Sequence, residues 1–126
     1  MSKQIISTEQ APKAIGPYSQ ANKLGNLVFV SGQLPLNPDT GKMPAGIEAQ
    51  AKQCLENLDA ILTASGSDLS KIVKTTIFLQ DLSNFQVVNQ IYGSYFSGDY
   101  PARSTVQVAR LPLDAEIEIE AVAAAE

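Results

Sequence analysis

The sequence predicts a single α+β domain over residues 1–126, in which two helices cover one face of a mixed six-stranded sheet. Three observations support this fold class. Strand-like segments fill the first thirty residues, the apolar spacing then becomes helical twice, and strand-like alternation returns near residue 101. No repeat, linker or low-complexity tract divides the chain. Two layers leave one sheet face uncovered, so we expect apolar residues on that face to be buried by other copies of the chain.

The first third of the chain predicts three strands. Residues 4–7 are a candidate for a short strand, which is followed by a polar loop. Residues 19–24 and 27–31 flank the turn Gly25–Asn26, which is the pattern of a β-hairpin. The second hairpin strand is nearly continuously apolar, which predicts an interior strand that is covered on both faces. Residues 32–46 contain three prolines and three glycines and predict an irregular loop.

Helical spacing begins at Ile47 and is expected to end at Gly66, a typical C-terminal glycine. Cys54 lies on the apolar stripe, which predicts a buried and inert thiol. A strand rich in β-branched residues follows at 72–79. The stripe of this first helix comprises Ile47, Ala51, Cys54, Leu55, Leu58, Ile61 and Leu62.

A second helix is predicted after residues 81–84, whose Asp, Ser and Asn side chains can cap it, and Gly98 is expected to end it. The dipeptide Tyr100–Pro101 marks a loop before the next strand, because the residue before proline favours extended conformations. Residues 111–114 predict a turn and residues 116–122 the last strand. The apolar stripe of the second helix comprises Phe85, Val88, Ile91, Tyr92, Tyr95 and Phe96.

Composition excludes several kinds of site. The chain has no histidine and one cysteine, so imidazole or thiolate metal sites and Ser-His or Cys-His nucleophiles are not expected. We expect no metal and no cofactor, and catalysis would use arginine, tyrosine, hydroxyls, carboxylates, backbone dipoles and water. A net charge of −4 argues against a nucleic acid partner. No apolar run is long enough for a membrane partner, and a lone cysteine without a signal peptide predicts a cytoplasmic protein.

The segment after Pro101 carries both arginines of the chain, Arg103 and Arg110. Alternation places Arg103, Thr105 and Gln107 on one face of their strand. A guanidinium at the mouth of a strand can clamp a small carboxylate through two parallel charge-assisted hydrogen bonds. The alternative interpretation is a solvated surface arginine, as most arginines are.

Three glutamates, Glu116, Glu118 and Glu120, share one face of the last predicted strand, roughly 7 Å apart from one to the next. The plain interpretation is an edge strand that is protected by charge. The alternative is that one of them points into a cleft, where partial burial raises its pKa and makes it a general base. Gly32 would allow a ligand close to the backbone, and a strand-to-loop turn explains this glycine equally well.

Taken together, four motifs resemble those of the reactive intermediate deaminase family, RidA (the YjgF-type proteins). The resemblance covers essentially the whole chain and implies a chorismate-mutase-like fold assembled as a homotrimer, with three active sites in clefts between subunits. It also implies hydrolysis of 2-imino acids, such as 2-iminobutanoate and 2-iminopropanoate, or of enamines such as 2-aminoacrylate, to 2-keto acids and ammonia. The motifs are Ala14-Ile15-Gly16-Pro17-Tyr18-Ser19-Gln20, Val30-Ser31-Gly32-Gln33-Leu34-Pro35, Pro101-Ala102-Arg103-Ser104 and Ile117-Glu118-Ile119-Glu120-Ala121-Val122-Ala123.

The resemblance also implies the roles of individual residues. Arg103 matches the arginine that binds the substrate carboxylate, and Glu118 matches the glutamate that positions a water molecule. Thr105 stands where many bacterial members have cysteine, and the segment before Pro101 is shorter than in some relatives. Two other functions remain open: a non-catalytic module that binds small carboxylates, and RNA binding or cleavage. The implied substrate pocket contains Tyr18, Ser31, Gly32, Asn89, Arg103 and Thr105.

Overall fold

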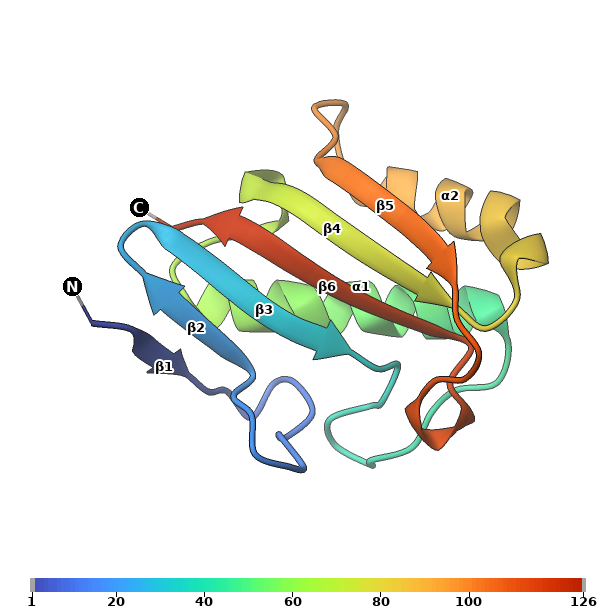
Figure 1. Ribbon diagram of the computed structural model, residues 1–126, viewed down its shortest axis with the longest axis horizontal. Coiled ribbons are helices and arrows are strands. Elements are labelled where there is room, and N and C mark those ends of the chain that lie inside the picture. Colours follow the sequence, from blue (N-terminus) through green and yellow to red (C-terminus); the bar gives the residue numbers. More distant parts are fainter. Residues whose placement is uncertain (1, 126) are drawn as a thin grey trace.

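The computed structural model describes residues 2–125 and has two layers, a six-stranded mixed sheet and a pair of helices on one of its faces (Figure 1). This confirms the predicted fold class. The strands lie in the order β1-β2-β3-β6-β4-β5, so the last strand enters the middle of the sheet. The strands are β1 (Gln4–Ile6), β2 (Ala21–Leu24), β3 (Leu27–Gln33), β4 (Ile72–Leu79), β5 (Ala102–Gln107) and β6 (Ile117–Ala124).

The longer helix, α1 (Ile47–Ala64), packs its apolar stripe against the sheet, and Leu58, Ile61 and Leu62 are fully buried. Gly66 follows with a φ of 80°, a left-handed conformation that glycine adopts without strain, as the sequence predicts. Cys54 is also fully buried, and burial raises the pKa of its thiol. The prediction of a buried thiol is therefore confirmed.

The shorter helix, α2 (Phe85–Ser94), lies beside α1 and near the β5 edge of the sheet (Figure 1). The carboxylate of Asp81 accepts a hydrogen bond from the amide of Ser83 and caps a short 3-10 turn before α2, instead of capping α2 itself. The helix ends at Ser94, four residues before Gly98, which was predicted to end it. Gly98 lies in the following loop, with a φ of 126°.

Strands β2 and β3 form the predicted hairpin around Gly25. Strand β3 is interior, but the prediction that both its faces are covered is wrong in this chain. Its side chains alternate, and Leu27 and Phe29 are 38% and 44% exposed on the face away from the helices. The strand also continues through Gly32 to Gln33, past the glycine that was expected to end it.

The charged last strand is not at an edge. Strand β6 pairs with β3 on one side and β4 on the other, which overturns the edge-strand interpretation of its glutamates. Ile117 and Ile119 point into the core, whereas Glu118 and Glu120 point to the uncovered face. Glu116 precedes the strand, and its backbone amide donates to the side-chain oxygen of Gln50.

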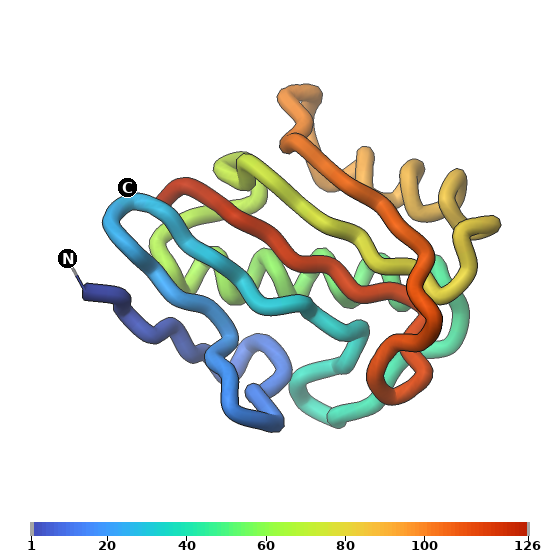
Figure 2. The backbone as a smooth tube through the Cα atoms, in the orientation of Figure 1, coloured from blue at the N-terminus to red at the C-terminus, as the bar shows by residue number. Residues whose placement is uncertain are grey.

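The edge of the sheet next to α2 is strand β5, which runs parallel to β4 (Figure 2). The tube in Figure 2 also shows the long return of the chain from β5 to β6, across the end of the sheet. Val106 of β5 is 43% exposed on the uncovered face, the face that also carries Phe29. No helix within residues 2–125 is long and apolar enough to cross a membrane.

Candidate functional site

Gly32, near the end of β3, lies in close contact with Glu118, near the start of β6. Strand β3 has a register irregularity between Val30 and Gln33, and such bulges redirect the local backbone and side chains. A Cβ added to Gly32 would lie 2.9 Å from Cδ of Glu118 and would overlap its Oε2. A side chain at position 32 would therefore displace the Glu118 carboxylate, which occupies that space.

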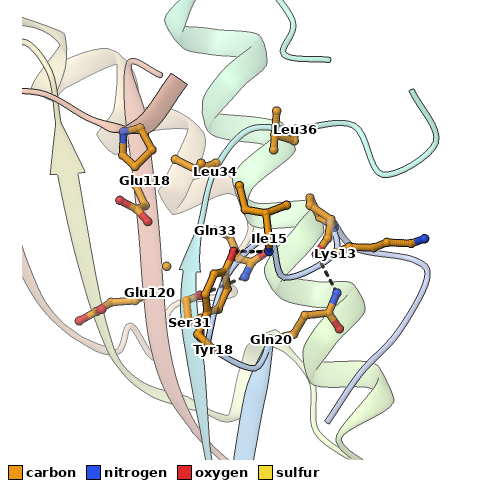
Figure 3. Close-up of a pocket in the computed structure, with 13 residues that line it drawn as sticks. Lys13, Ile15, Tyr18, Gln20, Ser31, Gln33, Leu34, Leu36, Glu118 and Glu120 are labelled. Carbon is orange, nitrogen blue, oxygen red and sulfur yellow. Dashed lines mark hydrogen bonds between the residues drawn. The ribbon is translucent and has the colours of Figure 1, made fainter. Parts of the chain in front are cut away.

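A hollow of about 470 Å³ opens beside this contact (Figure 3). It brings together four of the residues predicted for the site, Tyr18, Ser31, Gly32 and Glu118. They come from the loop before β2, from β3 and from β6, so the fold assembles them from distant parts of the sequence. The rest of the hollow includes an apolar wall of Pro12, Ile15, Leu34, Leu36 and Pro112.

The hydroxyl groups of this hollow have fixed orientations. The Ser31 hydroxyl donates to the carbonyl of Ser19 at 2.6 Å, so its oxygen is left to accept. The amide of Ile15 donates to the Tyr18 hydroxyl oxygen at 3.3 Å (Figure 3), so the Tyr18 hydroxyl remains able to donate. The hollow therefore offers one hydroxyl donor and one hydroxyl acceptor near the Glu118 carboxylate.

Burial, and secondarily the charge of Glu120, raise the pKa of Glu118 above its usual value. Glu120 is exposed and extends away from Tyr18 and Ser31, whereas Glu118 reaches towards the strand that carries Ser31 (Figure 3). A carboxylate with a raised pKa is a stronger base than an exposed one. Among the three glutamates, the environment therefore favours Glu118 as a general base.

The sequence analysis missed three buried amide side chains that hold the loops around this hollow. Gln20 accepts from the amide of Thr8 and donates to the carbonyl of Pro12, which fixes the loop before Tyr18. Asn57 of α1 donates to the carbonyls of Leu34 and Leu36, both at 3.0 Å. Gln50 similarly donates to the carbonyl of Pro44 and accepts from the backbone amide of Glu116. Only burial distinguishes these amides, and the sequence gives no signal for it.

A second hollow, of about 310 Å³, contains Arg103 and Asn89. Its remaining lining is largely aromatic and comes from α2 and the loop before β5: Tyr92, Gly93, Tyr100 and Pro101. Arg103 is partly buried and forms no ion pair within residues 2–125. The guanidinium is therefore charged, partly shielded from solvent and not neutralised by another side chain.

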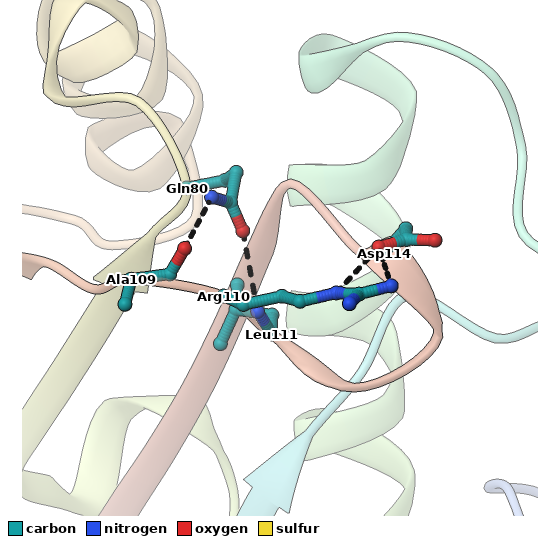
Figure 4. A network of polar contacts seen from close by, with 5 residues as sticks. All are labelled: Gln80, Ala109, Arg110, Leu111 and Asp114. Atoms are coloured by element: carbon teal, nitrogen blue, oxygen red, sulfur yellow. Dashed lines mark hydrogen bonds and ion pairs between the residues drawn. The ribbon is translucent and has the colours of Figure 1, made fainter.

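The other arginine of the chain has a structural role. Arg110 forms an ion pair with Asp114 at 2.9 Å, and Gln80 bonds the backbone of Ala109 and Leu111 on either side of it (Figure 4). These contacts hold the loop between β5 and β6. Arg103 is thus the arginine that is left to bind a ligand.

Two polar atoms near Arg103 are buried without a hydrogen-bond partner among residues 2–125. They are Oδ1 of Asn89, which lines the same hollow, and Oγ1 of Thr105, which lies two residues beyond Arg103 on the same face of β5. Buried polar atoms are rarely left unpaired in native proteins. Both residues were predicted from the sequence to line the site.

Arg103 and Glu118 project from opposite faces of the sheet. In the ladder, Arg103 is paired with Thr75 and Glu118 with Phe78, and both partners belong to β4. These partners are three residues apart, so their side chains point to opposite faces. Thr75 is fully buried on the helix side, whereas Phe78 is on the uncovered side. One chain therefore does not bring the two predicted catalytic side chains to one small molecule.

The class that these observations define is a small α+β protein with two hollows, one with an arginine that has no ion-pair partner within residues 2–125 and one with a carboxylate of raised pKa. The family model described as Endoribonuclease L-PSP matches residues 8–125. Reactive Intermediate Deaminase A, chloroplastic, of Arabidopsis thaliana is 57% identical over 96% of this chain, which spans 65% of that relative. The 2-iminobutanoate/2-iminopropanoate deaminase of Escherichia coli K12 is 53% identical over 94% of each chain. The chain belongs to this family, the RidA or YjgF-type proteins.

Solved structures agree with this assignment. Escherichia coli TdcF with bound serine is 46% identical, with a TM-score of 0.93 over 98% of this chain and 99% of the other. RidA from the Antarctic bacterium Psychrobacter sp. PAMC 21119 is also 46% identical, with a TM-score of 0.94 over 96% of this chain and 98% of that one. The mixed sheet with two helices is therefore the fold of the family.

Proposed function

We propose that this protein is a metal-independent hydrolase that converts 2-imino acids and their enamine tautomers, such as 2-aminoacrylate, into 2-keto acids and ammonia. The observation that carries the proposal is that the chain has both a partly buried arginine without an ion-pair partner within residues 2–125 and, in the other hollow, a glutamate of raised pKa. A 2-imino acid needs both groups, one for its carboxylate and one for the water that attacks C2. The names of relatives that are 53–57% identical support the same activity.

The working form is a homotrimer whose active sites lie between subunits. Because Arg103 and Glu118 project from opposite faces, they can meet at one substrate only if they come from two copies of the chain. The exposed apolar side chains of the uncovered face, including Phe29 and Val106, support an association through this face. A sedimentation experiment at micromolar concentration tests this part, and a mass equal to one chain would contradict it.

In the proposed reaction, the planar guanidinium of Arg103 binds the substrate carboxylate through two N–H donors. Glu118 takes a proton from water as the water oxygen forms a bond to C2, and passes this proton to the imine nitrogen to give the carbinolamine. Glu118 then takes the proton of the new hydroxyl and returns it to the amino nitrogen as the C–N bond breaks. Ammonia leaves, the 2-keto acid remains, and Glu118 is again a carboxylate. The hydroxyls of Tyr18 and Ser31 and the polar atoms of Asn89 and Thr105 complete the pocket. A positioned base of this kind contributes about 10²- to 10⁴-fold.

The test is release of ammonia and keto acid from freshly generated 2-aminoacrylate, corrected for spontaneous hydrolysis. We expect acceleration by the wild-type protein and none by Arg103→Ala. Binding of a keto acid without acceleration would show a carboxylate-binding module. The family description also names an endoribonuclease, so a single-stranded RNA is incubated in parallel. We expect no cleavage of this RNA, because the net charge of −4 opposes binding to phosphates.

A further inference from the structure

One face of α2 lies against the guanidinium of Arg103. Phe85, Asn89 and Tyr92 are four and three residues apart, so they share this face of the helix. The Cζ atom of Arg103 lies 5.5 Å from the ring centre of Phe85 and 5.1 Å from that of Tyr92. Both distances are within the range of a cation–π interaction. The arginine therefore contacts two rings that lie two helical turns apart.

Of the two rings, that of Tyr92 is firmly anchored. It is 4% exposed, packs against Phe96 with ring centres 4.8 Å apart, and its hydroxyl shares a 2.7 Å hydrogen bond with the hydroxyl of Thr75. Thr75 is fully buried and is the residue of β4 paired with Arg103. The anchor of the ring and the base of the arginine therefore lie side by side on adjacent strands. Phe85, in contrast, is the first residue of α2 and is 36% exposed.

Stacking on rings restrains an arginine without using its hydrogen-bond donors. A cation–π contact engages the flat face of the guanidinium, whereas a carboxylate binds in its plane through the N–H groups. An ion pair with a side-chain carboxylate would occupy those donors, and Arg103 forms none within residues 2–125. A long side chain that is restrained before the ligand arrives loses less entropy on binding.

We propose that Tyr92, assisted by Phe85, is a positioning residue that holds the Arg103 guanidinium in place with its N–H edge free for a planar carboxylate. The inference rests on the proposed role of Arg103 in carboxylate binding. It predicts that removal of the Tyr92 ring weakens carboxylate binding, although Tyr92 itself does not bind the carboxylate. If Tyr92 only stabilised the core, carboxylate binding by each variant would fall in proportion to the stability of that variant.

The composition of the chain gives a direct measurement. Arg103 and Arg110 are its only arginines, so a protein labelled with ¹⁵N-arginine gives two Nε–Hε resonances. Arg103→Lys identifies the Arg103 signal, and Arg110, which is paired with Asp114, is the internal reference. We expect the Arg103 signal to be displaced by ring currents in the wild-type protein and in Tyr92→Phe. In Tyr92→Leu it should move part of the way towards the position of a free arginine, because the Phe85 ring remains. An unchanged Arg103 signal in Tyr92→Leu would overturn the proposal.

Titration with pyruvate, a product-like keto acid, gives the functional measurement. Tyr92→Leu should bind pyruvate roughly tenfold more weakly, the size of a moderately shielded cation–π contact. Tyr92→Phe keeps the ring and should retain most of the binding, although loss of the Thr75 hydrogen bond lowers its thermal stability. Equal weakening in both variants, in proportion to their stability, would show a purely structural role and overturn the proposal.

Two further variants separate the possible failures. Phe96→Leu removes a ring of the same cluster that contacts Tyr92 but not Arg103, and it should leave the Arg103 signal in place. If Tyr92→Leu does not fold, the proposal is tested with Phe85→Leu, which removes the partly exposed ring. We expect this variant to bind pyruvate roughly threefold more weakly. No loss there would overturn the proposal. The arginine spectrum does not depend on imine hydrolysis, so failure of the proposed enzyme activity is recognised separately.

Discussion

The two hollows of this chain are built in different ways. The Arg103 hollow is formed by side chains of α2 and β5 and by the short loop before β5, and its central ring is anchored in the core. The Glu118 hollow has a floor of two strands, but much of its wall comes from loops that are held by Gln20 and Asn57. The comparison indicates that the Arg103 hollow is fixed mainly by packing. The wall of the Glu118 hollow is fixed by hydrogen bonds to loops, which tolerate sequence change more readily.

Within one chain, the sheet keeps Arg103 and Glu118 apart. A guanidinium next to Glu118 would lower the pKa of the carboxyl and would occupy the donors of the arginine. With the sheet between them, the pKa of Glu118 is raised by burial, and Arg103 has no ion-pair partner within residues 2–125. Within one chain, therefore, neither group neutralises the other.

The largest expected effect comes from mixing two inactive variants. Arg103→Ala and Glu118→Gln should each lose nearly all imine hydrolysis. If each site combines Arg103 of one chain with Glu118 of another, random mixing at equal amounts restores both residues in about a quarter of the sites. The measurement is 2-aminoacrylate hydrolysis after the two variants are unfolded and refolded together.

The control for this experiment is a mixture of Arg103→Ala with the double variant, which cannot form an intact site. Subunit exchange is verified by mass, with a tag on one variant. Absence of recovered activity in a verified mixed trimer would mean that the two residues do not act across subunits.

The next effect is confined to turnover. Glu118→Gln keeps the shape and one acceptor oxygen but cannot take a proton, so kcat should fall by about 10²- to 10⁴-fold with little change in KM. Glu116→Gln and Glu120→Gln remove the same charge from neighbouring positions and should keep most of the activity. Equal and small effects at all three positions would mean that Glu118 is an ordinary charged residue.

Many elements of the fold could be predicted from the sequence. The placement of Arg103 and Glu118 on opposite faces of the sheet could not. Local periodicity is enough to predict α1, the β2–β3 hairpin and the faces of β5 and β6, because each depends on spacing within one segment. The position of β6 between β3 and β4 depends on pairing between distant segments, and local alternation does not encode it. The alternating charges of Glu118 and Glu120 therefore suggested an edge strand. In the structure these residues lie on the uncovered face of an interior strand.

The same reasoning explains the residues that were missed or found. Phe85 and Tyr92 were recognised only as an apolar stripe, because helical spacing does not indicate that a cation from another element lies over the rings. The roles of Gln20 and Asn57 in holding loops were missed, although Gln20 ends a quoted motif, because a buried amide and an exposed amide look alike in a sequence. The site residues were predicted mainly from the resemblance to the family, because the fold of one chain does not bring them together.

A smaller effect is expected from the Gly32 contact. In Gly32→Ala the new methyl group would overlap the Glu118 carboxylate, so this side chain must move. A displacement of about 1 Å from the reacting geometry lowers activity by up to about 10²-fold. Kinetics of imine hydrolysis measure the loss, and pyruvate binding through Arg103 should be nearly unchanged. Gly93→Ala is a matched control in the other hollow, because a Cβ there has no neighbour within 4 Å. If Gly32→Ala retains full activity, the contact does not orient Glu118.

The smallest expected effect is the change in stability caused by Glu118→Gln. The sign of its dependence on pH distinguishes a carboxyl of raised pKa from an ordinary one. The folded state holds the proton of Glu118 more tightly than the unfolded state does, because burial raises its pKa above the ordinary value of 4.5. Below pH 4.5 the carboxyl is protonated in both states, and as pH rises through the raised pKa the wild-type protein loses stability that Glu118→Gln keeps. The variant should therefore unfold at a higher urea concentration than the wild type at pH 8. The difference in the free energy of unfolding should be up to about 1 kcal/mol for a partly exposed group, and smaller at pH 4.

Glu120→Gln removes the secondary cause of the raised pKa and should show a smaller change of the same sign. Urea profiles of Glu118→Gln and wild type that stay parallel across this pH range, at one fixed protein concentration, would mean that the Glu118 hollow does not raise the basicity of its carboxylate.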